Sequence, residues 1–121
     1  MTIRRLKTYT GSQGYVYQYY FVGKRPAKRS GASESDANEY IFDVTSDRKL
    51  TYAVSIFLPH KFVAAWAESH GRALGDSEQY AAVKMRLFRA FDEVEDMKAQ
   101  GRQLRIDPQS LEALLASLGV E

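Results

Sequence analysis

The chain contains no cysteine, only two histidines and three prolines, and no apolar run long enough to cross a membrane. Without cysteine there is no disulfide framework, no thiolate nucleophile and no cysteine-based zinc site. A membrane-spanning helix needs about 20 consecutive apolar residues, and the opening segment MTIRRLKTYTGSQ lacks the apolar stretch of a signal peptide. We therefore expect no membrane partner and a cytoplasmic location.

Motifs with a defined chemistry are missing as well. The sequence has no HExxH metal motif, no Walker A loop, no GxSxG nucleophile elbow and no dinucleotide-binding fingerprint. GxxG spacing occurs at residues 11–14, but in KH domains that loop joins two helices, whereas strand-like residues follow it here. The sequence thus indicates no catalytic residue and no cofactor, and it favours a protein that is not an enzyme.

His60 and His70 are the remaining candidates for a metal site. Both fall on the helix expected after Pro59, and their ten-residue separation corresponds to about 15 Å along a helix axis. One metal ion cannot be held by both. We therefore predict no metal site and assign the two histidines to the surface or to helix ends, where a protonated His70 would be favoured by the helix dipole.

The densest aromatic and β-branched segment is GYVYQYYFVGKR, residues 14–25. Side chains of an extended chain alternate between two faces. The residues of the first face are Tyr15, Tyr17, Tyr19 and Phe21, and those of the second are Val16, Gln18, Tyr20 and Val22. Both faces are apolar, so the core of the protein covers one face, and a helix, a subunit or a ligand must cover the other.

A short strand before the glycine-bounded turn at residues 11–14 predicts a hairpin with this segment. With Tyr9 opposite Tyr15, Lys7 would lie among the tyrosines of the first face, where an exposed cation–π contact contributes about 0.5–1 kcal/mol. The same register places Leu6 with the valines of the second face. We therefore expect the second face to pack against the core.

Two alternating strands follow a loop predicted at residues 24–38. In YIFDV and LTYAVSIFL, apolar side chains at even positions alternate with small or polar ones, which is typical of half-buried antiparallel strands. Both apolar sets lie on one face only if paired residue numbers have an even sum, for instance Val44 with Leu50. A connection of three or five residues around Ser46–Arg48 is therefore predicted.

Three helices are expected after these strands. Each has a capping residue or proline at its start and a glycine just beyond its end. Their predicted spans are 59–70, 76–100 and 108–118, with a short edge strand over 103–107. The predicted fold is a single α+β domain, residues 1–121, in two layers. An antiparallel meander of three or four strands, residues 3–58, is covered on one face by two to three C-terminal helices.

Charge is divided unevenly along the chain. Residues 1–29 carry seven basic side chains and no acid, while the rest of the chain carries ten basic against fifteen acidic side chains. This asymmetry fits an anionic partner for the N-terminal quarter. It fits equally well with neutralisation inside the fold or across a dimer.

Three functional hypotheses follow. The first is a non-enzymatic protein-interaction module, a homodimer that covers the aromatic face of the 14–25 strand, Tyr15, Tyr17, Tyr19 and Phe21, which the core leaves uncovered. The second is binding of single-stranded nucleic acid or another polyanion, because such sites combine aromatic platforms with positive grooves. The third is small-ligand binding or catalysis in a pocket between the sheet and the long helix. The candidate interaction surface comprises Arg4, Arg5, Lys7, Tyr15, Tyr17, Tyr19, Phe21, Lys24, Arg25, Lys28 and Arg29.

Overall fold

The structure, a computed structural model, describes residues 6–27 and 36–121, and the statements below concern these residues. The strands are β1 (Lys7–Thr10), β2 (Val16–Ala27), β3 (Ala37–Thr45), β4 (Tyr52–Pro59) and β5 (Gln103–Arg105). The helices are α1 (His60–His70), α2 (Asp76–Glu93), α3 (Met97–Gln100) and α4 (Pro108–Ser117). This is an α+β fold with a mostly antiparallel sheet packed against C-terminal helices, as predicted.

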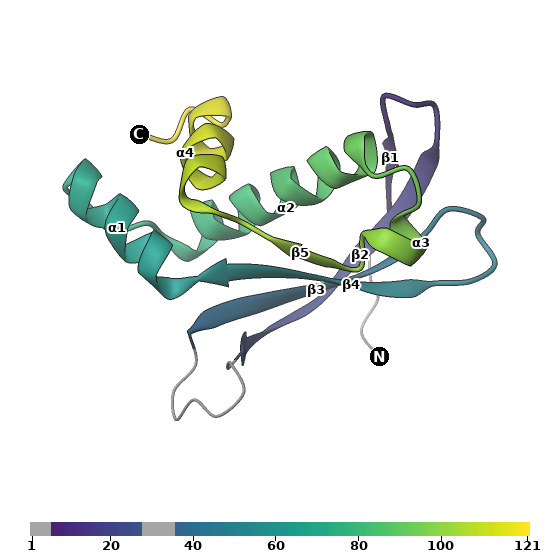
Figure 1. Cartoon of the computed structure of the whole chain (residues 1–121), viewed down its shortest axis with the longest axis horizontal. Coiled ribbons are helices and arrows are strands. Elements are labelled where there is room, and N and C mark those ends of the chain that lie inside the picture. The colour runs from purple at the N-terminus through teal and green to yellow at the C-terminus, as the bar shows by residue number, and fades with distance from the viewer. Residues whose placement is uncertain (1–5, 28–35) are drawn as a thin grey trace.

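The strands form one sheet in chain order, β1-β2-β3-β4-β5 (Figure 1). The first four strands make an antiparallel meander, and β5 joins the edge of β4 in parallel. A parallel neighbour requires a long crossover, and the helices α1, α2 and α3 supply it. The predicted edge strand is confirmed, although it has three residues.

One face of the sheet carries the core. Val54 and Ile56 of β4 are fully buried, as are Leu87 and Phe91 on the facing side of α2. The alternation predicted for β3 and β4 is therefore confirmed, because their even-numbered residues meet the helices. The short helix α3 lies near the edge of β4 and contributes Met97 to the same core.

The orientation predicted for the 14–25 strand is wrong. Tyr17 and Tyr19 face the helices and are only 3% and 4% exposed, whereas Val16 and Val22 are 42% and 38% exposed. The ring of Tyr17 stacks on Phe91 of α2 with 4.3 Å between centroids. Alternation does not distinguish the faces of a strand that is apolar on both sides, and the aromatic surface of α2 decides the orientation.

In both hairpins the paired residue numbers have an even sum, as predicted, so the parity of each register is right. Each observed pairing is shifted by two residues from the predicted one. Lys7 pairs with Tyr19 in the first hairpin. In the second hairpin Val44 pairs with Tyr52, so seven residues connect the last pair instead of three or five. Because the parity is right, the shift changes the partners but leaves the same side chains together on each face of the hairpin.

The longer second connection is stabilised by the side chain of Asp47. Its Oδ1 accepts hydrogen bonds from the backbone N–H groups of Lys49 and Leu50 at 2.8 and 3.0 Å. The hydroxyl of Thr45 accepts the N–H of Arg48, which has a left-handed φ of 65°. These contacts satisfy backbone donors locally, so β4 begins at Tyr52 and Leu50 stays exposed.

The loop predicted at residues 24–38 is also shorter than expected at both ends. Strand pairing continues from Lys24 opposite Tyr40 to Ala27 opposite Ala37. Before this stretch the register shifts, because Phe21 pairs with Phe42 but Gly23 pairs with Ile41. This β-bulge adds one residue to β2 and reverses the phase of its side chains.

The single helix predicted over residues 76–100 is in fact two. Helix α2 ends at Glu93, Val94 has an extended ψ of 116°, and Asp96 caps α3 by accepting the N–H of Ala99. Acidic side chains at a helix C-terminus interact unfavourably with the helix dipole, and α2 has no basic residue in its last turn. The predicted caps at Gly71 for α1 and at Asp107 for α4 are both present.

Candidate interaction surface

The face of the sheet opposite the long helices, here called the open face, has no described helix packed on it (Figure 1). Three aliphatic side chains on or beside β1 and β2 are exposed: Leu6 at 52%, Val16 at 42% and Val22 at 38%. Tyr20, Ile41 and Phe57 are partly exposed on the same face. The open face therefore carries exposed apolar side chains, and no described helix packs over them.

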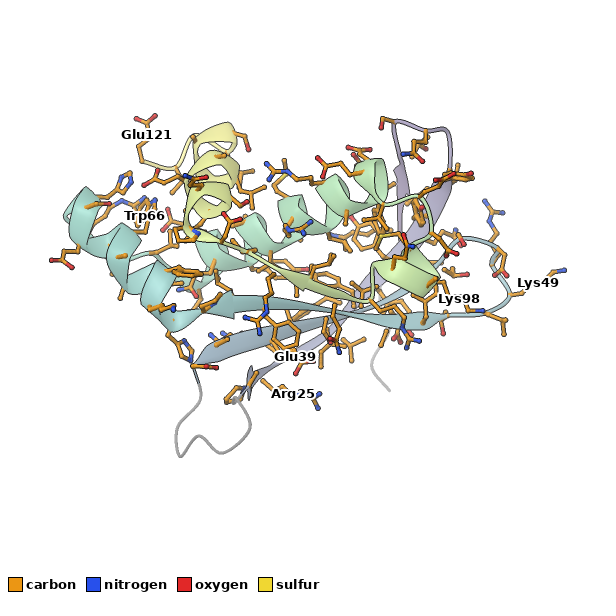
Figure 2. All side chains as sticks on the ribbon, viewed as in Figure 1. Arg25, Glu39, Lys49, Trp66, Lys98 and Glu121 are labelled. Atoms are coloured by element: carbon orange, nitrogen blue, oxygen red, sulfur yellow. The ribbon has the colours of Figure 1, made fainter. Side chains whose placement is uncertain are left out.

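A polar cluster lies within the open face, and Figure 2 shows Arg25 and Glu39 on the side away from the helices. The Glu39 side chain accepts hydrogen bonds from Arg25 Nε at 2.8 Å and from Ser55 Oγ at 2.6 Å. The hydrogen bond from Arg25 is the main reason that the pKa of Glu39 lies below its ordinary value, and it outweighs burial. Glu39 is thus an ionised, satisfied carboxylate.

A second polar contact lies beside this cluster. The hydroxyl of Tyr20 on β2 donates to Asp43 Oδ2 on β3 at 2.7 Å. At the opposite margin, the Arg105 guanidinium lies 5.6 Å from the ring centroid of Phe57. The open face therefore carries carboxylates near its centre and arginines toward its margins.

The open face is hollowed where β4 meets β5. Six residues line this hollow of about 510 Å³: Ala53, Ser55, Ala99, Gln100, Arg102 and Gln103. Arg102 Nε donates to the carbonyl of Ala53 at 3.2 Å, which holds the guanidinium against the edge of β4. The lining is mostly polar, so this end of the open face offers hydrogen-bonding groups.

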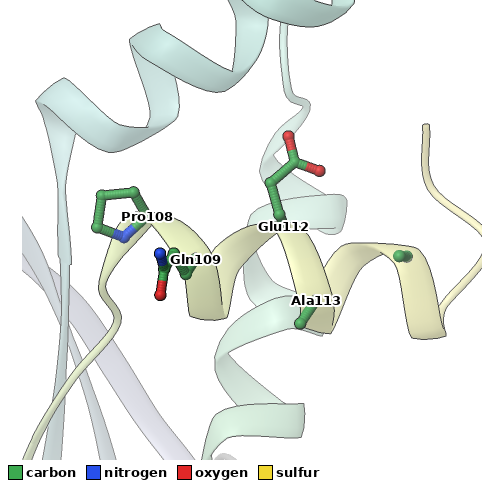
Figure 3. A pocket seen from close by; sticks show the side chains of 5 residues that line it. Pro108, Gln109, Glu112 and Ala113 are labelled. Atoms are coloured by element: carbon green, nitrogen blue, oxygen red, sulfur yellow. The ribbon is translucent and has the colours of Figure 1, made fainter.

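A different hollow of about 590 Å³ lies on α4, lined by Pro108, Gln109, Glu112, Ala113 and Ala116 (Figure 3). All of these residues come from one helix. The hollow is a shallow helix surface, and no second element contributes a chemical group to it.

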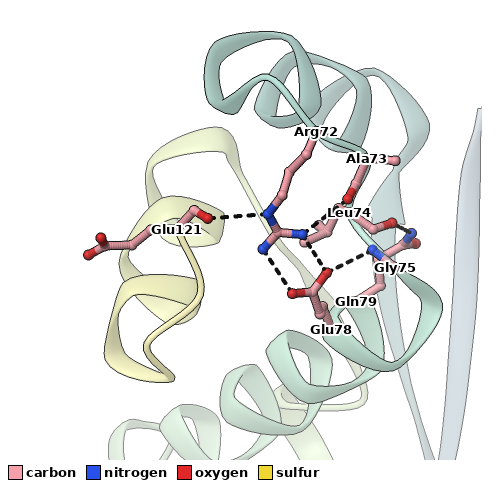
Figure 4. A network of polar contacts seen from close by, with 7 residues as sticks. All are labelled: Arg72, Ala73, Leu74, Gly75, Glu78, Gln79 and Glu121. Carbon is pink, nitrogen blue, oxygen red and sulfur yellow. Dashed lines mark hydrogen bonds and ion pairs between the residues drawn. The ribbon is translucent and has the colours of Figure 1, made fainter.

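A polar network joins the α1–α2 connection to the end of the chain (Figure 4). The guanidinium of Arg72 contacts both carboxylate oxygens of Glu78, at 3.0 and 2.9 Å, and donates to the carbonyl of Glu121 at 3.2 Å. The hydrogen bond from Arg72 is the main reason that the pKa of Glu78 falls to about 2. This network ties α4 to the rest of the helical layer.

The two histidines occupy the ends of α1, as expected. His70 stacks on Trp66 with 4.1 Å between ring centroids, and its Nε2 lies 2.7 Å from a carboxylate oxygen of Glu112. In the described ranges, no group of three or more histidine and acidic side chains is arranged to hold a metal ion. The absence of a metal site from the whole chain remains a prediction.

The structure separates the residues of the predicted interaction surface. Tyr17 and Tyr19 lie in the core, Tyr15 is 50% exposed near the β1–β2 turn, and Phe21 is 37% exposed beside α2. Of the basic residues, Arg25 lies on the open face, whereas Lys7 and Lys24 pair opposite core tyrosines on the other face. The remaining four, Arg4, Arg5, Lys28 and Arg29, lie outside the described residues.

The exposed aliphatic residues of the open face are not among the predicted surface residues. The β2 segment is apolar at odd and even positions, and this pattern does not show which of its two faces the helices cover. Comparison of the chain with protein-family models, with curated proteins and with solved structures finds no significant match. None of the described helices has both the length and the apolar composition to span a membrane.

Proposed function

We propose that the protein is a non-enzymatic interaction module that forms a homodimer through the open face of its sheet. The observation that carries this proposal is the set of exposed aliphatic side chains, Leu6, Val16 and Val22, on a sheet face without a helix. Large exposed apolar patches are uncommon on monomeric proteins and mark interaction sites. Two such sheets pack face to face about 10 Å apart.

The size of the open face is adequate for a subunit interface. Five strands spaced by about 4.8 Å and a nine-residue strand at about 3.4 Å per residue give a flat area of roughly 600 Å². Stable interfaces bury about 800 Å² per partner. Side-chain relief and the adjoining hollow at β4 and β5 add to the flat area, so the open face reaches the required range.

The distribution of charge favours a second copy as the occupant. A two-fold interface is self-complementary, because residue i of one copy contacts residue j of the other and residue j contacts residue i. The open face carries both signs, with Glu39 and Asp43 near its centre and Arg25, Arg102 and Arg105 toward its margins. A two-fold axis that lies in the interface, between the carboxylates and the arginines of one margin, brings the arginines of one copy opposite the carboxylates of the other.

Light scattering after size exclusion tests the proposal with the full chain. The wild type should have twice the chain mass of 13.7 kDa at micromolar concentration and at both low and high salt. Val22→Glu and Val16→Glu each place a charge on the open face, and both variants should have the mass of one chain. A monomeric wild type would refute the proposal.

Leu50→Glu is the matched control, because Leu50 is an equally apolar side chain, 60% exposed, in the β3–β4 connection. It should remain dimeric. Circular dichroism must show that all variants keep their secondary structure. If the open-face variants stay folded and dimeric, the interface lies elsewhere and the proposal is wrong.

A further inference from the structure

Cationic and aromatic side chains alternate along the line where α2 crosses the β1–β2 side of the sheet. We call Lys7, Phe21, Tyr80, Lys84 and Phe88 the lysine seam. Tyr80, Lys84 and Phe88 are four residues apart and share one face of α2. Tyr80 packs edge-on against Phe21 of β2 with 5.0 Å between centroids, and Phe88 packs against Tyr19, the partner of Lys7, at 5.6 Å.

Two cations of the lysine seam lie close together on β1 and α2. Lys84 Nζ lies 5.8 Å from the ring centroid of Tyr80 and 6.0 Å from that of Phe88, and the Phe88 ring packs against Tyr19, the strand partner of Lys7. Burial, together with the neighbouring charge of Lys7, lowers the pKa of Lys84. Two neighbouring like charges repel each other unless an anion lies between them.

The described part of the chain does not supply that anion. None of the ion pairs between described residues involves Lys7 or Lys84. One turn beyond Phe88 on the same face of α2, Asp92 accepts hydrogen bonds from Tyr9 at 2.9 Å and from the N–H of Ser12 at 2.8 Å. This acid is therefore engaged by the β1–β2 hairpin and not by the lysines.

We propose that Lys7 and Lys84 together bind the phosphate group of a nucleotide, either free or within a single strand, whose base lies on the exposed part of Phe21 beside Tyr80. Two ammonium groups from different elements present six N–H donors to one phosphate, and charge-assisted contacts of this kind are the strong ones. The phosphate also relieves the repulsion between the two lysines.

The aromatic residues of the lysine seam make a nucleotide a better fit than a bare anion. Phe21 is 37% exposed, and Tyr80 and Phe88 are half-buried, so ring surface remains accessible next to the cations. Stacking of a base on an aromatic side chain contributes about 1–3 kcal/mol and tolerates any base. A third cation, Lys24, lies 5.8 Å from the ring centroid of Tyr40 on the same side of the sheet, where it extends the positive surface for a following phosphate.

The lysine seam and the open face belong to opposite sides of the sheet, so this proposal does not depend on the proposed dimer. Substitutions in the lysine seam should leave the mass measured by light scattering unchanged. Failure of one proposal therefore leaves the other intact.

Isothermal titration calorimetry on the full chain tests the site with four probes: 5′-AMP, adenosine, inorganic phosphate and a single strand of about ten deoxyadenosines. We expect AMP or the strand to bind, and each to bind more tightly than phosphate or adenosine alone. Lys7→Gln and Lys84→Gln should each weaken that binding about tenfold. For the strand, each substitution should lower the slope of log affinity against log salt by about 0.7.

Lys49→Gln and Lys98→Gln are the matched controls, because they remove the same charge from lysines outside the lysine seam, in the β3–β4 connection and on α3 (Figure 2). Both should bind like the wild type. Four outcomes would overturn the proposal: no binding of AMP or the strand, equal affinity for AMP, the strand and inorganic phosphate, equal losses in the controls, or no loss in Lys7→Gln and Lys84→Gln. Binding of the strand but not of AMP, with the predicted dependence on the two lysines, supports the site and identifies a polymer as the source of the phosphate.

Discussion

The two faces of the sheet come from the same alternating strands and differ in what completes them. On the covered face, Tyr17 stacks on Phe91 and Phe42 is fully buried. On the open face, hydroxyl, carboxylate and guanidinium groups satisfy one another, and the aliphatic residues around them stay exposed. On the covered face, helices of the same chain thus bury the apolar side chains. On the open face, hydrogen bonds satisfy the polar groups, but the apolar side chains stay exposed.

This difference shows that burial of a strand residue is decided by the element packed on it. Tyr19 and Tyr20 are neighbours in one strand, yet Tyr19 is 4% exposed against α2 and Tyr20 is partly exposed and donates to Asp43. Their intrinsic propensities for a strand are identical. The covered face should therefore contribute most of the free energy of folding of one chain, and the open face most of the free energy of association of two chains.

The largest expected effect is the loss of an aromatic side chain from the covered face. Phe91→Ala removes a fully buried ring that contacts three tyrosines, and it should lower the free energy of unfolding by about 3–5 kcal/mol. Urea denaturation, monitored by circular dichroism, measures this loss of stability. Val16→Ala on the open face should cost under about 0.5 kcal/mol in the monomer. A comparable loss in the two variants would remove the contrast between the faces.

Alkaline pH should weaken the covered face next. Burial raises the pKa of Tyr52 to about 12, and burial also raises the pKa values of Tyr17, Tyr19 and Tyr40. The unfolded chain ionises near pH 10 while the folded chain keeps its phenols neutral, so stability is fully present below pH 10 and falls as pH rises toward 12. Denaturation midpoints across this range measure the loss, and Tyr52→Phe should reduce its slope. A flat stability profile up to pH 12 would contradict the burial of these phenols.

The smallest expected effects come from removing one tyrosine hydroxyl group on each face of the sheet. Tyr20→Phe removes the hydrogen bond to Asp43 on the open face and should cost about 0.5–1.5 kcal/mol. Tyr40→Phe removes a buried hydroxyl that has no hydrogen-bond partner among the described residues, so it should be neutral or stabilising. Thermal unfolding of both variants under one condition checks the sign. A destabilised Tyr40→Phe would indicate a partner for that hydroxyl.

Much of the fold was predictable because periodicity has a direct structural meaning. Alternation at Val54 and Ile56 fixed which side of β4 meets the core, and Asp107 followed by proline located the start of α4. Both hairpin registers had the right parity but the wrong position. Parity follows from the pattern of apolar residues, whereas position depends on turn contacts such as those of Asp47, which the pattern does not contain.

The candidate surfaces were less predictable because they depend on tertiary contacts. No local feature of the sequence shows which apolar face of β2 meets α2. The lysine seam brings Lys7 near Lys84 although they are far apart in the chain, and only the four-residue spacing of Tyr80, Lys84 and Phe88 on one helix face can be derived from the sequence. The end of α2 at Glu93 was not predicted, because the helical period of apolar residues continues past it through Val94 and Met97.

The β-bulge has a consequence for insertions and deletions. Val22 is the surplus residue of β2, and every strand partner on either side of it is already in place, from Phe21 opposite Phe42 to Gly23 opposite Ile41. Deleting Val22 would therefore give an uninterrupted ladder with all of these partners retained, whereas deleting a residue elsewhere in the paired stretch would exchange the faces of all that follows. The bulge is thus the position in this strand where a gap in a sequence alignment is compatible with an unchanged core. It also sets the side that each later residue takes, so Lys24 lies on the covered side opposite Tyr40 and Arg25 lies on the open face opposite Glu39.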